Sequence, residues 1–349
     1  MFQDDIVRLA TSVESAQAGN NKLDCVMECK LLDFNIEKSG VLVLGPRKKQ
    51  KEIIQQVEES PLTLGDKPVK LFETEKYLGD YISSKGLTHG VLTTVKRRKP
   101  KVVQSVIETK SVVEDCKMNS LGGLEAGIKI WDIAIMPFLL NNCETWVDIS
   151  RESIKILDDL QLMFLRYMFG TSRTCPTPIL LWESGSFMME HRIAQKKLIF
   201  YHHLINLPKG SLAYEVTQIQ DILGFPGLVQ ESKLLIEKYE LPSPESCTKG
   251  QWRGLTKKAI TKQNKKDILE KMKSFKKVDY SIHAQESFGL QDYVKNLNIP
   301  DARLKFALRY KMLRTVQMNF KGEKHYKDNG WKCLSCNICF PVKVTIFSE

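Results

Sequence analysis

The spacing of hydrophobic residues changes after the first quarter of the chain. Short runs rich in β-branched residues come first and predict strands, whereas later apolar residues recur every three or four positions and predict helices. In the first part we expect a helix over residues 12–32, capped by the Ser12 hydroxyl, and a buried strand over residues 40–45. Residues 62–83 are expected to form a β-hairpin with a turn at Gly65-Asp66.

The rest of the chain reads as helix almost throughout. Pro100 is expected to start one helix, Pro137 to stop the next, and Gly170 to follow the end of a third. A shorter amphipathic helix is expected over residues 188–206, and the prolines of residues 241–250 predict a linker or surface loop. We therefore expect an α+β protein, in which a small antiparallel sheet with a helix precedes a mainly helical part.

The composition favours a folded protein with an anionic partner. Hydrophobic residues make up 42% of the chain, and the net charge is +11 with a pI near 9.1. A positive field of this kind makes nucleic acid the expected partner. The apolar runs are too short to span a bilayer, and the N-terminus lacks the apolar region of a signal peptide. An intracellular protein is expected, nuclear or cytoplasmic and not secreted, with mostly reduced cysteines.

Three segments near the start carry a specific resemblance. The chain opens with Phe2-Gln3-Asp4-Asp5, and two adjacent carboxylates on a tight turn can hold divalent metals against a triphosphate. Next come Asn35-Ile36-Glu37-Lys38-Ser39-Gly40, running into an apolar stretch, and Tyr77-Leu78-Gly79-Asp80-Tyr81-Ile82. In this order, the segments resemble the later palm motifs of reverse transcriptases from LINE-type (non-LTR) retrotransposons.

Two further segments extend the resemblance into the helical part. Residues 136–146 resemble the Pro-x-Leu-Leu-Tyr-Gly-x-Glu-x-Trp segment of the family's thumb, with Asn141 and Asn142 in place of Tyr-Gly. Residues 160–168 resemble the helix that follows it in the family. The division implied by the resemblance is the C-terminal half of a palm (1–85), a helical thumb (86–170), a basic helical region (171–330) and a truncated zinc-knuckle-like tail (331–349).

The resemblance implies a centre for two-metal nucleotidyl transfer. By this match Asp4 is a magnesium ligand and Asp5 a secondary or orienting carboxylate. Lys38 would approach the leaving pyrophosphate, and its alternative is a solvated lysine at a strand entrance. The residues that match the primer grip, whose backbone groups hold the primer end, are Tyr77, Leu78 and Gly79.

Residues 6–10 allow two interpretations. Ile6, Leu9 and Val13 fall at helical spacing, with Asp4 or Asp5 as the N-cap. In a palm, the same residues would instead be the second strand of a hairpin whose turn carries the Asp pair.

The given sequence contains no earlier palm strand with the other metal-binding aspartate, and no fingers. The expectation is a truncated reverse-transcriptase-like protein of retrotransposon origin. It would not carry out RNA-directed DNA synthesis alone, but would bind a primer–template or a nucleic-acid duplex. Two alternatives stay open: a domesticated helical protein-interaction module without a nucleic-acid role, and an active enzyme whose fingers come from another chain.

Two basic stretches are candidates for phosphate contacts. One lies at residues 96–101, where a thumb would face a duplex, and the other runs from Arg253 to Lys277. Aromatic residues are sparse in both, which argues against single-strand stacking platforms. For either stretch the alternative is a solvated helix face. The residues of the first stretch along the chain are Lys96, Arg97, Arg98, Lys99 and Lys101.

The tail offers a candidate zinc site. Cys333 and Cys336 form a Cys-x-x-Cys pair, with Cys339 as a third ligand and His325 as a distant fourth. The family's pattern would place a histidine and another cysteine downstream, and the sequence departs from it there. The alternative is a truncated knuckle with free thiols. The histidines, His191 among them, show no metal-binding spacing and are expected to lie at the surface or in packing contacts.

Overall fold

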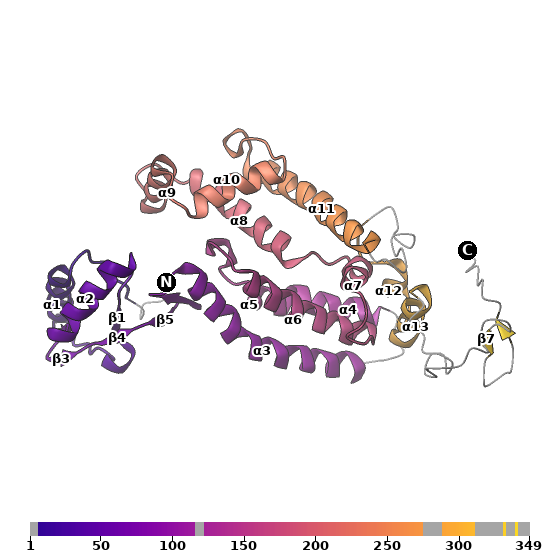
Figure 1. Cartoon of the computed structure of the whole chain (residues 1–349), viewed down its shortest axis with the longest axis horizontal. Coiled ribbons are helices and arrows are strands. Elements are labelled where there is room, and N and C mark those ends of the chain that lie inside the picture. The colour runs from indigo at the N-terminus through magenta and orange to yellow at the C-terminus, as the bar shows by residue number, and fades with distance from the viewer. Residues whose placement is uncertain (1–5, 116–121, 275–287, 311–330, 333–338, 341–349) are drawn as a thin grey trace.

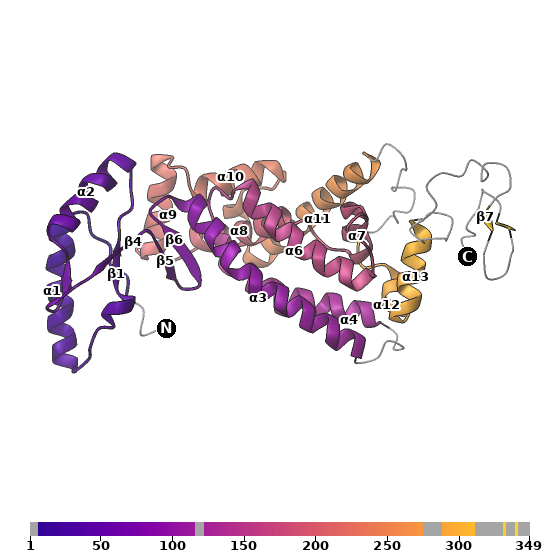
Figure 2. The same cartoon turned by 60° about the horizontal axis from the view of Figure 1, so that its bottom comes forward.

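The computed structural model describes residues 6–115, 122–274, 288–310, 331–332 and 339–340. The protein is α+β and mostly helical, in agreement with the expected fold class. Figure 1 shows a small N-terminal unit of helices and short strands next to an elongated helical body. Figure 2 shows the same division after rotation.

The N-terminal unit is built around a pair of parallel strands. Its elements in chain order are α1 (Val13–Lys30), η1 (Ile36–Lys38), β1 (Gly40–Leu42), α2 (Arg47–Glu59), β2 (Thr63–Leu64), β3 (Lys67–Pro68) and β4 (Lys70–Phe72). β1 and β4 pair in parallel, which requires the intervening α2 and β2–β3 hairpin to cross over between them. The buried members of its core cluster are Val57, Leu62 and Val69.

The expectations for this unit are met in part. The Ser12 hydroxyl caps α1 in a capping box with Ser15, and Gly65-Asp66 forms the turn between β2 and β3, as expected. The expectation of a single antiparallel sheet is wrong, because the described strands form separate two-stranded sheets and one of these is parallel. Residues 6–10 form neither a helix nor a strand, so both interpretations of that segment are wrong.

The second half of the expected hairpin is a separate hairpin that docks on the helical body. β5 (Thr74–Tyr77) pairs antiparallel with β6 (Asp80–Ser83), and β6 lies on α3 (Leu87–Asp115). Thr94 Oγ1 accepts a hydrogen bond from the Tyr81 N–H at 2.8 Å. At Gly90 the helix approaches so closely that an added Cβ would lie 2.4 Å from the Tyr81 carbonyl oxygen.

The remaining described elements are mostly helices, with a short strand pair in the tail. They are α4 (Gly123–Ile130), the π-helical η2 (Trp131–Ile135), α5 (Met136–Leu139), η3 (Cys143–Thr145), α6 (Arg151–Phe169), α7 (Thr177–Ser184), α8 (Met189–Ile205), α9 (Leu212–Leu223), α10 (Leu228–Lys238), η4 (Pro244–Ser246), α11 (Lys249–Lys273), α12 (Asp292–Asn296), α13 (Ile299–Arg309), β7 (Trp331–Lys332) and β8 (Cys339–Phe340).

Pro100 lies inside α3, so the expectation that it starts a helix is wrong. Val95 and Val102, on either side of it, are both fully buried in the main core. Packing therefore holds the helix together across a residue that cannot donate a backbone hydrogen bond. By contrast, Gly170 follows the end of α6 in the left-handed conformation, as expected.

Pro137 does not stop its helix either. It lies in the first turn of α5, which continues directly from η2. The Met136 N–H donates to the Trp131 carbonyl oxygen, five residues back, in a π-helical turn. A proline is tolerated in a first turn, and π-helical turns commonly accompany local irregularities inside helices.

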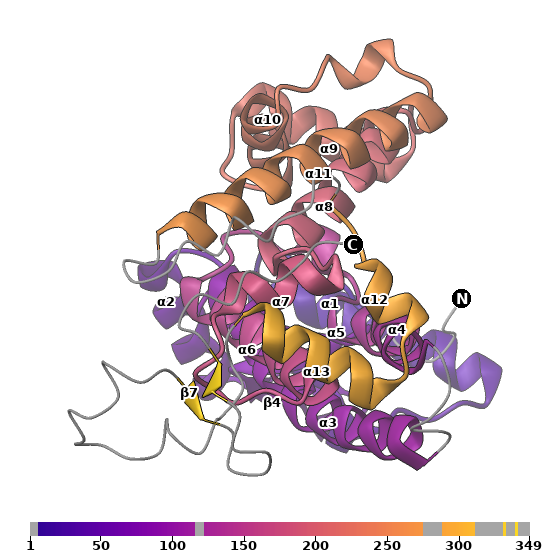
Figure 3. The same ribbon diagram turned by 90° about the vertical axis from the view of Figure 1, so that its right-hand side faces the viewer.

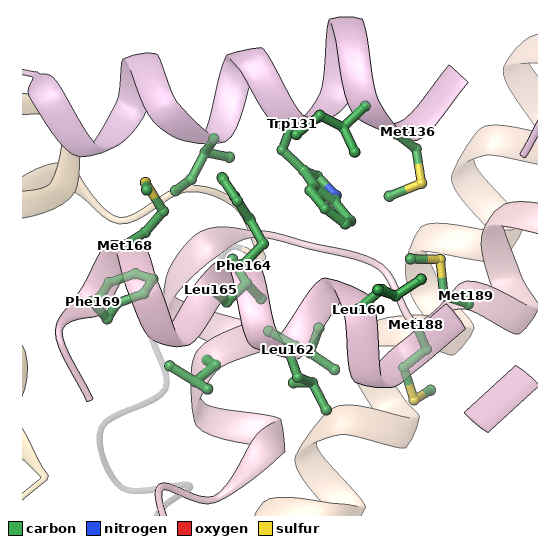
Figure 4. Close-up of a cluster of buried hydrophobic side chains, with 14 of the residues drawn as sticks. Trp131, Met136, Leu160, Leu162, Phe164, Leu165, Met168, Phe169, Met188 and Met189 are labelled. Atoms are coloured by element: carbon green, nitrogen blue, oxygen red, sulfur yellow. The ribbon is translucent and has the colours of Figure 1, made fainter. Parts of the chain in front are cut away.

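The main core lies where η2 faces α6. The Trp131 and Phe164 rings stack with centroids 4.7 Å apart, and both side chains are fully buried. Figure 4 shows them with Leu160, Leu165 and Met168 of α6 beneath the π-helical segment. Sulfur-containing and aliphatic side chains fill the space around the ring pair, as expected for irregular gaps in a core.

A buried carboxylate joins α7 to the C-terminal helices. Glu183 is 0% exposed and accepts hydrogen bonds from the Tyr310 hydroxyl and from Arg309 Nη2, the latter at 3.2 Å. Burial raises the pKa of Glu183, and the Arg309 guanidinium acts in the opposite direction. Figure 3 shows α12 and α13 beside α4 and α6, where this contact holds them.

We expect Gly90→Ala to destabilise the protein by about 1–3 kcal/mol, because the added methyl group would collide with the Tyr81 backbone rather than a flexible side chain. Gly254→Ala is the matched control, since Gly254 lies in α11 with open space around it. That change should stabilise the fold by about 0.5–1 kcal/mol. Denaturant midpoints measure both effects, and equal stabilisation by the two changes would contradict the close packing at Gly90.

Candidate functional site

Several expected site residues lie outside the described part of the chain. These are Asp4 and Asp5, the expected magnesium ligands, and Cys333 and Cys336, the expected zinc ligands. Lys38 is described, and it is exposed at the end of η1, just before β1. An exposed lysine before a strand fits both a contact with pyrophosphate and a solvated side chain, so the role of Lys38 stays a prediction.

Tyr77, Leu78 and Gly79 form the end of the β5–β6 hairpin. Because Tyr77 pairs with Asp80, Leu78 and Gly79 are a two-residue turn. Their φ angles are 47° and 93°, the left-handed conformations that tight hairpin turns require. The end of the hairpin contacts the helical body through its backbone, and one buried arginine binds it there.

Arg98 of α3 is the centre of this junction. Its guanidinium donates four hydrogen bonds, to the carbonyl oxygens of Gly79 (2.9 Å), Leu139 (3.1 Å) and Asn141 (2.9 Å) and to Asp80 Oδ1 (2.7 Å). The same group lies over the Trp146 ring, 5.6 Å from its centroid. A planar guanidinium suits such a site because it presents several donors in fixed directions and stacks on aromatic faces.

Two lysines of α8 bind the loop that follows α5. Lys196 Nζ of α8 donates to the Leu140 carbonyl oxygen at 2.9 Å, and Lys197 Nζ donates to the Trp146 carbonyl oxygen at 2.6 Å. The buried Lys197 is also paired with Glu231 of α10. Cationic side chains therefore satisfy the carbonyl groups of the irregular segment after α5, which the regular helices leave without partners.

The junction brings together two segments that resemble the same family. The hairpin end belongs to the segment 77–82, and the loop belongs to the segment 136–146. Asn142 Nδ2, at one of the positions where the sequence departs from the family's pattern, donates to the Leu78 carbonyl oxygen at 3.0 Å. The side chain that replaces the family's glycine thus contacts the hairpin directly.

Burial governs the electrostatics of the junction. It raises the pKa of the Asp80 carboxyl, although the Arg98 guanidinium acts in the opposite direction, and it lowers the pKa of Arg98. Burial also raises the pKa of Cys143 to about 12, so this thiol is protonated at neutral pH and is a poor nucleophile. In these groups burial is the largest cause of each shift, and their hydrogen bonds lie within the junction.

The junction changes the interpretation of the predicted residues. The carbonyl oxygens of Leu78 and Gly79 already accept hydrogen bonds from Asn142 and Arg98. Arg98 is 7% exposed, so its assignment to phosphate contact is wrong, because its hydrogen bonds are used within the fold. The sequence could not separate Arg98 from its charged neighbours, although it lies one helical turn from the buried Val95 and Val102 and thus on the buried face.

The other cations of this stretch remain at the surface. Lys96 is exposed and pairs with Glu152 at 2.8 Å, and the Arg97 guanidinium lies 6.0 Å from the centroid of the Tyr81 ring. Lys99 and Lys101 are exposed on either side of Pro100. Within this stretch, the prediction of phosphate contact is therefore limited to Lys96, Arg97, Lys99 and Lys101.

The second basic stretch forms a more regular surface on α11. Its buried residues recur every four positions, and they are Trp252, Thr256, Ile260, Asn264, Ile268 and Met272. Lys258, Lys262 and Lys266 follow the same interval two residues out of step, so they lie on the opposite side of the helix and are exposed. We call these three lysines the α11 basic face.

The two basic stretches do not form one surface. Figures 1 and 3 show α3 and α11 on opposite sides of the helical body. α6 packs on α3, whereas α7 and α8 pack on α11, and these helices separate the two stretches. A single straight duplex would therefore contact one stretch and not both.

We expect Arg98→Ala to destabilise the protein by about 3–5 kcal/mol, because it leaves Asp80 and three backbone carbonyl groups, of which that of Leu139 is buried, without their donor. Arg97→Ala, at the exposed neighbouring position, is the control and should change stability by no more than about 1 kcal/mol. Chemical denaturation of both variants measures this difference, and a similar small effect for both would remove the central role of Arg98.

No helix in the described ranges is long and apolar enough to cross a membrane. A scan of protein-family profiles, a search of curated proteins and a search of solved structures each found no match to this chain.

Proposed function

We propose that this chain is a reverse-transcriptase-like protein of the LINE type that binds duplex nucleic acid through the α11 basic face. The support for the lineage is the order of the motifs along the chain and the meeting of two of them at the Arg98 junction. The support for binding is the charge of α11, and the binding proposal depends on that helix alone. In this proposal RNA-directed DNA synthesis is the activity of the lineage rather than of the chain by itself.

The distribution of charge on α11 is the observation that carries the binding proposal. Arg253, Lys257, Lys271 and Lys273 are exposed on the same helix as the basic face, while Asp267 and Glu270 are its only acidic residues. Lysines four residues apart stand about 6 Å from one another along a helix. Such a row can contact successive phosphates, and contacts of this kind are independent of sequence and sensitive to salt.

Within the described part of the chain, the cations of the basic face are not occupied by strong ion pairs. Lys262 is paired with Glu240, but the distance is 4.0 Å and both side chains are 85% exposed. Exposed pairs of this type contribute little, so a phosphate can replace the carboxylate at small cost. The buried stripe on the other side of α11 fixes the helix, and the lysines are thereby presented to solvent as a group.

The test is a triple substitution with a charge-matched control. Lys258→Gln, Lys262→Gln and Lys266→Gln together should make the negative slope of log Kobs, the observed binding constant for a DNA duplex, against log salt less steep. The slope should decrease in magnitude by about 2–3, since each phosphate contact contributes about 0.9. Lys48→Gln, Lys49→Gln and Lys51→Gln, at exposed positions of α2, remove the same charge and should leave the slope unchanged. Equal slopes for both triple variants would show that net charge, and not the α11 basic face, attracts the duplex.

A second candidate function is a protein-interaction module, and the exposed apolar surface of α9 favours it. Leu212 and Ile222 are 80% and 81% exposed, and Phe225 just beyond the helix is 57% exposed. Thr217 is the buried residue of this helix. Large exposed apolar side chains that gather on one element are typical of binding surfaces. Absence of salt-dependent duplex binding by the unsubstituted chain would favour this second function.

A further inference from the structure

A histidine and a carboxylate of α8 meet a carboxylate of α11 where the two helices cross. His191 Nε2 lies 3.0 Å from Asp267 Oδ2 and 3.8 Å from Glu190 Oε1, and the three ligand atoms lie within 4.8 Å of one another. We propose that these three side chains form a site for a divalent transition metal ion, tested here as zinc. The proposal is independent of nucleic-acid binding.

The donor atoms fit the chemistry of such an ion. Zinc binds imidazole nitrogen and carboxylate oxygen at about 2.0–2.2 Å, so three ligands of a tetrahedral ion lie slightly more than 3 Å apart. The separation of His191 Nε2 from Asp267 Oδ2, 3.0 Å, is close to this value, and a rotation of the exposed Glu190 side chain would bring its carboxylate, now 3.8 Å from the imidazole, into position. A mixed nitrogen and oxygen set favours zinc and its neighbours over magnesium, which prefers oxygen alone. A fourth position would be left to water.

The second ring nitrogen has the partner that a metal-binding histidine needs. His191 Nδ1 lies 2.8 Å from the Tyr239 hydroxyl, and the imidazole is fully buried. With the metal on Nε2, the single ring proton is carried by Nδ1, and this N–H donates a hydrogen bond to the Tyr239 oxygen. The imidazole therefore stays neutral when the metal binds. Outer hydrogen bonds of this type fix the ring and its tautomer. Gln263 Nε2 holds Asp267 in a similar way, by donating to its Oδ1 at 2.7 Å.

The surroundings keep the imidazole available to a metal. Burial lowers the pKa of His191, while the facing carboxylates of Glu190 and Asp267 raise it and Lys238 lowers it further. The ring is thus neutral at pH 7, which is the form that binds a metal. Asp267 and Glu190 are partly exposed, and this side of the cluster gives the ion its path from solvent.

Zinc here would link α8 to α11. The two helices already contact one another through Trp252, whose indole N–H donates to the Leu198 carbonyl oxygen at 2.9 Å. A metal bond farther along the same pair of helices would hold α11 against the helical body, with the α11 basic face still turned to solvent. Since the ion would bind the folded state alone, zinc would raise the melting temperature of the chain.

The experiment uses the full chain with Cys333→Ser, Cys336→Ser and Cys339→Ser, so that the tail cannot supply thiolate ligands. Zinc competition with a chromophoric chelator should give one equivalent of bound zinc, and cobalt should give a visible d–d absorption band. Asp267→Asn and Glu190→Gln, which keep size and hydrogen-bonding capacity, should each weaken zinc binding at least about tenfold. The rise in melting temperature with zinc should disappear in parallel.

His203→Ala is the matched control, because His203 is exposed on the same helix and outside the cluster. It should bind zinc with unchanged affinity. Melting curves without metal verify that the carboxylate variants are folded. The proposal is overturned if the cysteine-substituted chain binds no stoichiometric zinc, or if the carboxylate variants bind it as tightly as their parent.

Discussion

The position of the β5–β6 hairpin on the helical body depends on the buried guanidinium of Arg98. It binds the end of the hairpin, the loop after α5 and the face of Trp146. A buried charge is costly unless it is paired and hydrogen-bonded, and Arg98 has one ion pair and four hydrogen bonds. The site therefore specifies one arrangement of hairpin and loop, because any other would leave the charge or the carbonyl groups unsatisfied.

The sequence predicted local features of the fold better than long-range ones. The cap at Ser12 and the glycine after α6 depend on neighbouring residues alone, and both were recognisable. The predictions from Pro100 and Pro137 were wrong, because buried side chains on either side of Pro100 hold its helix together, and because Pro137 lies in a first turn that follows a π-helical turn. The parallel pairing of β1 with β4 joins residues about thirty positions apart, and local patterns carry little information on such pairing.

The sequence predicted the charged surfaces of the candidate site but not the contacts of its individual residues. A run of cations predicted a charged surface on α3, but the one residue of the run that faces the core determines the local structure. On α11, the four-residue interval of the buried residues already separates the lysines that face outward. The histidine cluster was not recognisable, because Asp267 lies 76 positions from His191 and reaches it only through the packing of two helices. The predicted magnesium ligands Asp4 and Asp5 and the predicted zinc ligands Cys333 and Cys336 lie outside the described residues, so their roles stay predictions.

The small core of the N-terminal unit has a consequence for how the molecule opens. Three buried aliphatic side chains and a pair of three-residue strands stabilise this unit, whereas the body is stabilised by stacked rings and buried ionic contacts. Free energies of local unfolding follow the apolar area that each part removes from water. We therefore expect the unit from α1 to β4 to unfold in separate, more frequent excursions, while the β5–β6 hairpin remains attached to α3 in the more slowly opening, cooperative part of the chain.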